Sequence, residues 1–276
     1  MIKDIVVNLS VAEGSGFAGD YAVSVASLLD AHLTGIAFVY DPIVPVAATG
    51  YIPPEVIETQ RRDSEAAAKA AIDRFAAATA RAGVAAEPRT LSASFAGAGD
   101  HFGRIARRFD LAIVGQVEPE TNAVEEMIAE STLFEAGRPV IMVPYIQKAP
   151  LKLDLAMVCW DGSRPAARAI GDAMPLLERA RLVEVVIIAN ERGKQDEIAG
   201  ADMGQHLARH GLKVDVKRTV SGDIDVADAL LSHAADSGAD FIVMGGYGHS
   251  RLREFVLGGV TRSILRSMTA PVLMSH

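Results

Sequence analysis

The sequence is poor in several residue types, and each shortage narrows the class of protein. It contains a single cysteine among 276 residues, so no disulfide can form within the chain, as is usual in a reducing compartment. Lys and Arg number 27 against 35 Asp and Glu, and this balance argues against nucleic acid or membrane-surface binding, which needs clustered cations. No apolar run approaches the ~18 residues of a membrane span. The amino terminus lacks the long apolar segment of a signal peptide, so we expect a cytoplasmic protein without a membrane partner.

Half of the residues are hydrophobic, and the length suggests one large or two ordinary domains. Three pairs of segments resemble one another in the same order, namely 2–10 with 151–160, 107–115 with 237–245 and 137–144 with 269–275. The offset falls from 150 residues in the first pair to 130 and 132 in the others, so about 20 extra residues lie in the first copy, near 41–60. The sequence therefore predicts two domains of one kind, at 1–146 and 151–276, joined by "PYIQKAP" (144–150).

Each copy alternates short apolar runs with longer amphipathic segments. Such alternation predicts parallel sheets with helices on both faces, and so two tandem flavodoxin- or Rossmann-like α/β domains with five strands each. In the second copy we expect strands at 155–160, 183–189, 214–220, 241–244 and 271–274, with helices at 165–181, 195–210, 224–237 and 260–268. Gly211 is expected to end the second of these helices.

The segment "MGGYGHSRLREFVLGG" (244–259) follows the fourth of these strands, at the edge of the sheet where ligands of such folds bind. Glycines let backbone N–H groups approach an anion, and the helix that follows would point its positive end at it. The alternative is a loop that only turns the chain from strand to helix. No Gly-Lys-Ser/Thr follows, so this is not a P-loop.

The segment "DFIVMGGYGHSRLREFVLGGVTRSILRSMTAPVLM" (240–274) resembles the carboxyl-terminal signature of universal stress proteins. Nucleotide-binding members carry G-2x-G-9x-G followed by Ser or Thr, and Gly245, Gly248 and Gly258 fit that pattern. The turn "CWDGSRPAARAI" (159–170) also resembles the family's first strand-to-helix turn, in which the aspartate lies near the ribose and phosphates. Together with the repeats, the resemblance identifies the whole chain as a tandem universal stress protein.

The resemblance implies a cytoplasmic stress-response sensor or regulator that binds ATP or AMP in the second domain, with Mg²⁺ accompanying ATP. It implies no catalytic residue, slow ATP hydrolysis at most, and no metal held by the protein alone. The two domains would pack as a pseudo-dimer through their final strands, 139–143 and 271–274, which would also serve self-association. The implied nucleotide-binding residues are Asp161, Ile188, Ala189, Met244, Gly245, Gly248, His249, Gly258, Gly259 and Val260.

Two departures from the family pattern weaken the expected site. Gly259 stands where the pattern has Ser or Thr, and losing a hydrogen bond to a charged group costs ~1.5–3 kcal/mol, or roughly tenfold to a hundredfold in affinity. The first copy lacks the loop glycines after Gly115 and carries Glu118, Glu120, Glu125 and Glu126 instead. With Val11 taken as the counterpart of Asp161, we expect the first copy to be degenerate as a nucleotide site.

Three other interpretations stay open. The chain could be an interaction or dimerisation module of the same family that binds no nucleotide, with 41–60 as a partner surface or lid. "GSGFAG" (14–19) with Asp41 further on mimics a dinucleotide fingerprint, although four residues separate it from the first strand. Asp202, His206 and His210 have helical metal-ligand spacing, but a solvated helix face is the expected reading, and Cys159 is expected to be a buried, inert thiol.

Overall fold

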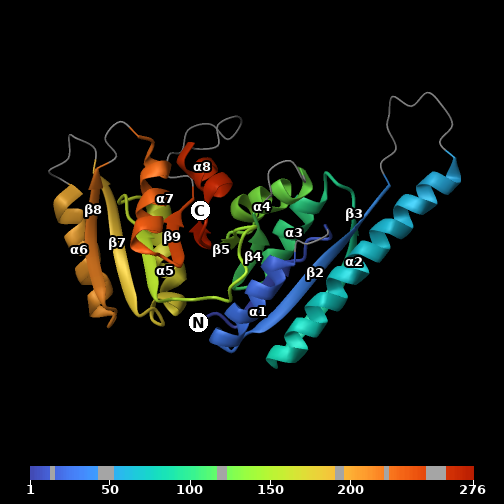
Figure 1. Cartoon of the computed structure of the whole chain (residues 1–276), viewed down its shortest axis with the longest axis horizontal. Helices are drawn as coiled ribbons and strands as arrows, with labels where there is room; N and C mark the ends of the chain where they lie inside the picture. Colours follow the sequence, from blue (N-terminus) through green and yellow to red (C-terminus); the bar gives the residue numbers. More distant parts are fainter. Residues whose placement is uncertain (13–15, 43–52, 117–122, 190–195, 221–223, 247–258) are drawn as a thin grey trace.

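The computed structural model describes residues 1–12, 16–42, 53–116, 123–189, 196–220, 224–246 and 259–276. Ten strands form a single sheet with helices on both faces (Figure 1). The first half of the chain contains β1 (Asp4–Asn8), α1 (Phe17–Leu29), β2 (His32–Tyr40), α2 (Pro54–Ala82), β3 (Ala86–Ala93), α3 (Ala98–Ala106), β4 (Leu111–Gly115), α4 (Ala123–Glu135) and β5 (Val140–Val143). The second half contains β6 (Leu155–Cys159), α5 (Arg164–Leu177), β7 (Leu182–Ala189), α6 (Asp196–Arg209), β8 (Val214–Val220), α7 (Val226–Ser237), β9 (Phe241–Gly245), α8 (Gly259–Ser267) and β10 (Val272–Ser275).

The strand order repeats itself about the middle of the sheet. The order is β3-β2-β1-β4-β5-β10-β9-β6-β7-β8, so each half places its strands in the same sequence outward from its fifth strand. All pairs within a half are parallel, as predicted from the alternation of strands and helices. The one antiparallel pair joins β5 to β10, with Leu273 opposite Ile141. The α/β class with two five-stranded halves is therefore confirmed.

Two hydrophobic layers enclose the sheet. One layer packs α1, α2, α5 and α6 against one face, and the other packs α3, α4, α7 and α8 against the opposite face. Each layer runs without a break through both halves, because strand residues on either side of the β5–β10 junction belong to the same cluster. Burial on both faces explains why the central strands read as continuous apolar runs rather than as alternating ones.

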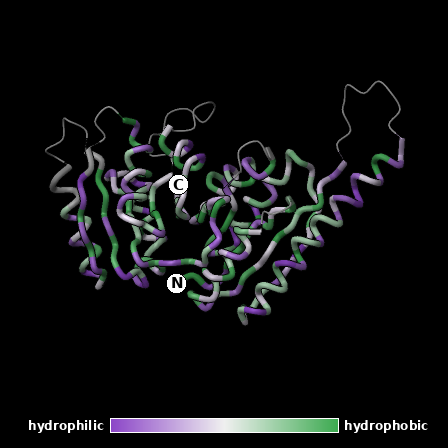
Figure 2. Tube along the Cα trace, viewed as in Figure 1, coloured by the Kyte–Doolittle hydropathy of each residue, from purple (hydrophilic) through white to green (hydrophobic). Residues whose placement is uncertain are grey.

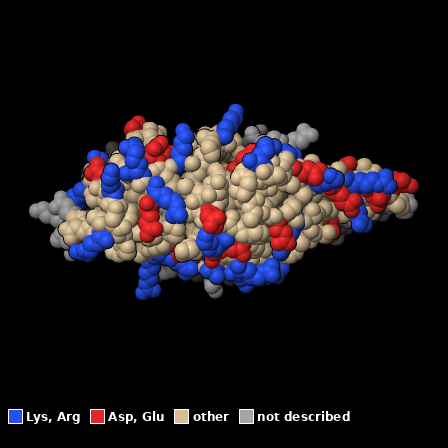
Figure 3. Space-filling view, turned by 90° about the horizontal axis from the view of Figure 1, so that it is seen from below, with Lys and Arg blue, Asp and Glu red and all other residues tan. Residues whose placement is uncertain are grey.

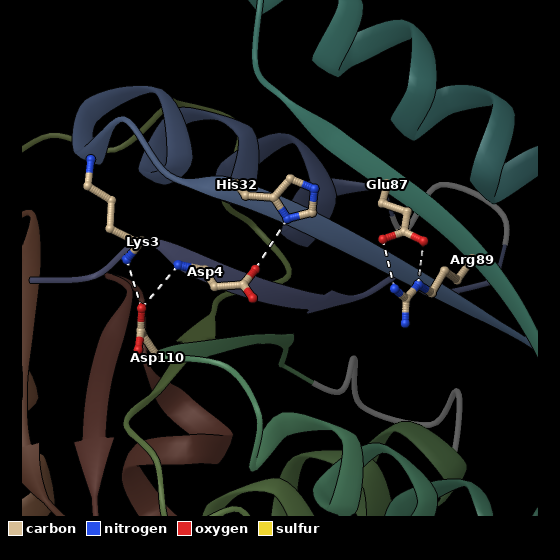
Figure 4. Close-up of polar contacts among 6 residues, drawn as sticks. All are labelled: Lys3, Asp4, His32, Glu87, Arg89 and Asp110. Carbon is tan, nitrogen blue, oxygen red and sulfur yellow. Dashed lines mark hydrogen bonds and ion pairs between the residues drawn. The ribbon is translucent and has the colours of Figure 1, made fainter.

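One aspartate in each half ties the start of the first strand to the start of the fourth. The carboxylate of Asp110 accepts the backbone N–H groups of Lys3 and Asp4 at 2.8 and 3.1 Å (Figure 4). The carboxylate of Asp240 accepts those of Asp154 and Leu155 at 2.9 and 3.2 Å. The same contact therefore occurs twice, at equivalent places in the two halves.

These paired contacts correct the alignment of the two copies. They match Asp4 with Leu155, an offset of 151 residues at the first strand instead of the 150 predicted from the letters. The ends of these strands give the same offset, because the N–H of Leu9 bonds to the carbonyl of Ile36 just as the N–H of Trp160 bonds to the carbonyl of Val186. Ser10, and not Val11, is consequently the structural counterpart of Asp161.

The extra residues of the first half lie in the crossover between its second and third strands, as predicted. α2 has 29 residues where α6 has 14, and its outer end extends beyond the sheet (Figure 1). Every residue from Pro53 to Asp63 is exposed, and this end is predominantly hydrophilic (Figure 2). Its surface mixes both signs of charge (Figure 3), in part through the ion pairs Arg61–Glu65 and Arg62–Glu58.

The predicted elements of the second half all occur, with small shifts at their ends. β8 matches its predicted bounds, and Gly211 follows α6 with φ of +84°, a conformation that glycine adopts without strain. α5 ends at Leu177, four residues before the predicted end. No helix in the described part of the chain is long and apolar enough to cross a membrane.

The final strands pair with each other inside the chain, which changes one expectation. β5 lies between β4 and β10, and β10 lies between β5 and β9, so both edges of each strand are occupied. The predicted contact near a pseudo-twofold axis is present. Self-association of separate chains through these strands was also expected, and that expectation is wrong because no edge of either strand is free.

Candidate functional site

The turn after β6 is built by the sequence Asp-Gly-Ser. Asp161 is exposed at the carboxyl end of the strand, and its Oδ1 accepts the N–H of Ser163 at 2.9 Å. Gly162 has φ of +74°, and the hydroxyl of Ser163 accepts the N–H of Ala166 to cap α5. These contacts fix the direction of the Asp161 carboxylate at the rim of the sheet.

Gly245 brings the end of β9 into contact with this turn. A Cβ at this position would lie 2.5 Å from the backbone nitrogen of Ala166 and 2.7 Å from the carbonyl carbon of Pro165, so only glycine fits. The preceding Met244 is buried, with its side chain in the hydrophobic layer. Only the backbone of Met244 is therefore available to a ligand.

The predicted loop residues Gly248, His249 and Gly258 lie outside the described residues. The structure resumes at Gly259, the first residue of α8, where a Cβ would meet nothing within 4 Å. The side chain of Val260 packs against the hydrophobic layer, and Thr261 is buried, so neither replaces the missing hydroxyl. The open space at Gly259 means that a serine would fit there.

The ends of β7 and β8 form the other wall of this region. Ile188 pairs with Thr219 and Ala189 with Val220, which places both of these predicted nucleotide-binding residues at the carboxyl end of β7, beside β6. Sequence reasoning missed Trp160, which lies between Cys159 and Asp161 and packs against the hydrophobic layer. Its indole N–H is buried and has no acceptor among the described residues.

Cys159 is a weak nucleophile in this setting. Burial, with the nearby charge of Asp161, raises the pKa of its thiol to about 12. A thiol that stays protonated at neutral pH is unreactive, as the sequence predicted.

The corresponding region of the first half has different chemistry. The hydroxyl of Ser10, the counterpart of Asp161, donates to Oε1 of Glu125 in the first turn of α4. Burial raises the pKa of the Glu125 carboxyl, and burial and the Glu125 charge also raise the pKa of Tyr40. Tyr40 ends β2 and stacks on Phe95 with ring centroids 4.6 Å apart. An acidic group thus lies in the first turn of α4, and the degenerate site stays a prediction.

The two other candidate sites lack supporting geometry. His206 on α6 and His210, directly after it, are exposed with their rings edge to face, and the part of the chain that the structure describes holds no group of three metal-ligating side chains. At the glycine-rich segment, α1 begins at Phe17, well after β1 ends at Asn8. A cavity of about 40 Å³ lined by Ser10, Gly16 and Arg74 lies there, far too small for a dinucleotide. A Cβ at Gly19 would lie 3.2 Å from Leu9, so this glycine serves packing.

The fold and this edge define a doubly wound α/β protein with Gly245 and an Asp-Gly-Ser turn at the carboxyl ends of its strands. Residues 156–276 match the model of the universal stress protein family.

Relatives agree with this assignment. A universal stress protein of Synechocystis sp. is 32% identical over 90 residues, which cover 32% of this chain and 30% of that protein. One from Methanocaldococcus jannaschii is 36% identical over 47 residues, 17% of this chain and 29% of that protein. The chain thus spans about a third of the length of the curated relatives that it matches.

One solved structure extends the likeness of fold to both halves. A universal stress protein from Archaeoglobus fulgidus has a TM-score of 0.73, with 99% of this chain and 97% of that chain covered at 16% identity. At this identity the likeness concerns the fold of the whole chain alone.

Proposed function

We propose that this chain is a tandem universal stress protein, with domains at 1–146 and 151–276, that binds ATP or AMP weakly in the second domain. It would act in the cytoplasm as a sensor or regulator, with Mg²⁺ accompanying ATP and no strong catalysis. The observation that carries the proposal is the contact of Gly245 with the first turn of α5. That contact supports the proposal because Gly245 lies against the first turn of α5, and Asp161 lies in the turn that leads into the same helix.

The described residues suggest how a nucleotide would be held. The first N–H groups of α8 have no partners within the helix, and the helix dipole favours an anion at Gly259 and Val260. Asp161 is exposed, and the backbone N–H that it accepts among the described residues reaches Oδ1, so its second oxygen can bond a ribose hydroxyl. The backbone at Ile188 and Ala189 closes the base end of the site. Gly259 supplies an N–H but no hydroxyl, which accounts for weak binding.

The first domain is proposed to bind no phosphate. Glu125 occupies the first turn of α4, where the field of the helix would otherwise favour an anionic ligand. Its carboxyl already receives the Ser10 hydroxyl, and its negative charge would repel a phosphate. Nucleotide is therefore expected at one site per chain.

Titration calorimetry of ATP with Mg²⁺, and of AMP, tests the proposal on the wild type and on Gly259→Ser. A serine at this open position restores the missing hydroxyl, so the affinity is expected to rise roughly tenfold or more, at one site per chain. Gly171→Ser is the matched control, because a Cβ at that α5 glycine also meets nothing within 4 Å. Its affinity should equal that of the wild type. Absence of binding in both wild type and Gly259→Ser would contradict the nucleotide site.

The second candidate function is an interaction module that works through its surface. The exposed outer end of α2 favours it, since Val56 and Ile57 are 45% and 37% exposed on a helix that has no counterpart of this length in the second half. No nucleotide binding by the wild type, with binding restored in Gly259→Ser, would favour this function.

A further inference from the structure

The carboxyl end of α8 is held by a residue from the other half of the chain. Gln116 directly follows β4, and its Nε2 donates to the carbonyl oxygens of Leu265 and Arg266 at 2.9 and 3.0 Å. Its Oε1 accepts the N–H of Tyr145 at 3.2 Å, and its own N–H bonds to Val143 at 2.7 Å. Gln116 is 4% exposed, so the amide is buried with its main hydrogen-bonding atoms in use.

These bonds matter to α8 because the last carbonyls of a helix have no partner within it. The two bonds from Gln116 are part-buried, a hydrogen bond of this kind contributes ~0.5–1.5 kcal/mol, and α8 is only nine residues long. A helix this short is unstable by itself and depends on its contacts. The Gln116 amide therefore supplies a cap that α8 does not provide for itself.

Among the described residues, no side chain at the position equivalent to Gln116 bonds to the end of α4, so the arrangement is asymmetric. The counterpart of Gln116 in the second half is Gly246, whose N–H bonds to Ser275 as that of Gln116 bonds to Val143. Gly246 has no side chain, and the side chain of Leu133 on α4 packs 3.3 Å from where its Cβ would be. The carbonyl of Glu135 at the end of α4 is bonded instead by Arg107, a residue of its own half.

We propose that Gln116 is a positioning residue through which the first half fixes α8, and that nucleotide affinity in the second half depends on it. The dependence on nucleotide rests on the proposed function, whereas the anchoring of α8 does not. α8 spans ~13 Å from its anchored end to Gly259, and a helix transmits a tilt or shift along its length. Loss of the amide displaces the N–H groups that would face the phosphates. The site is thus incomplete without a residue that lies 143 positions before Gly259.

The test compares Gln116→Glu and Gln116→Leu with Ser24→Ala. The glutamate variant nearly preserves shape and keeps an acceptor for Tyr145, but it points an oxygen at the two α8 carbonyls. The leucine variant removes the donor without adding charge. Ser24→Ala is the matched control, because it deletes another bond between the halves, from Leu151 N–H to Ser24 Oγ at 2.8 Å, at a place that does not touch α8.

The first readout is amide hydrogen exchange in α8 without ligand, at the N–H of Met268, which bonds to Ile264. We expect exchange at least tenfold faster in both Gln116 variants and wild-type exchange in Ser24→Ala. Wild-type exchange in both Gln116 variants, or equal acceleration in Ser24→Ala, would overturn the anchoring.

The second readout is the Kd for ATP with Mg²⁺, expected to weaken about tenfold in the Gln116 variants and to stay unchanged in Ser24→Ala. Fast exchange in α8 with an unchanged Kd would overturn the dependence of binding on Gln116. Fast exchange with no ATP binding by the wild type would support the anchor and refute the nucleotide function, so the two failures are distinguishable.

Discussion

At the scale of the residue, the two halves differ most at a single carboxyl. Glu125 is buried beside the Ser10 hydroxyl, and burial raises its pKa, so ionising it costs the folded protein free energy. Its counterpart region in the second half holds glycines. Glu125 thus places a carboxyl in the first turn of α4, where the field of the helix favours negative charge.

Replacing Glu125 with Gln is expected to stabilise the protein at neutral pH. Because the folded pKa lies above the unfolded one, the wild type is favoured fully below the unfolded pKa and loses that contribution as pH rises through the folded pKa. The gain from Glu125→Gln should therefore be largest near pH 8 and small near pH 4. Urea unfolding at both pH values measures it.

Glu126→Gln is the control for this prediction, since Glu126 is the exposed neighbour in the same helical turn. It should leave the free energy of unfolding nearly unchanged at both pH values. An equal effect of the two substitutions would mean that general charge reduction, and not burial of Glu125, is responsible.

At the scale of the element, the approach of β9 to α5 defines the site. Gly245 allows the strand end to touch the first turn of the helix, and Ser163 caps that same turn. The packing of these two elements therefore brings the end of β9 against the helix that follows the Asp161 turn.

Gly245→Ala is expected to destabilise the fold by about 1–3 kcal/mol, because its Cβ would overlap backbone atoms of α5. Gly171→Ala should instead stabilise by roughly 0.5–1 kcal/mol, since that helical glycine has open space around it. Thermal and urea unfolding of the two variants give the comparison. Equal stability of Gly245→Ala and the wild type would show that β9 and α5 can separate without cost.

The sequence predicted the helices and strands better than it predicted the contacts between them. Apolar periodicity and the stop at Gly211 gave nearly all of the second half, and the motif gave Asp161 and Gly245. Ser10 was missed as the counterpart of Asp161 because both first strands are continuous apolar runs. Such runs can be aligned one residue out of register without disturbing the apolar pattern. Gln116 was missed because its partners lie 149 and 150 positions away, and no local pattern marks such a contact.

At the scale of the whole molecule, the β5–β10 pair makes one sheet from two halves. Val272, Leu273 and Met274 are all fully buried at this junction, so each half alone would expose an apolar edge. Stability of the chain is expected to depend on both halves remaining together.

Residues 151–276 produced alone should form a dimer by pairing β10 with β10 of a second copy, with mass measured by size-exclusion chromatography and light scattering. Leu273→Lys would place a charge at the junction and should leave the fragment monomeric. A fragment without that substitution that stays monomeric at tens of micromolar would contradict a role for β10 in holding the halves.

Joining two similar halves in one polypeptide also changes how a single substitution affects the molecule. In a symmetric dimer of identical chains, every substitution appears twice and alters both sites together. Here a substitution appears once, so the two halves can carry different residues at equivalent positions. Gln116 in the first half corresponds to Gly246 in the second, and Ser10, which bonds Glu125, corresponds to Asp161. The covalent link therefore lets the two copies diverge independently at equivalent positions.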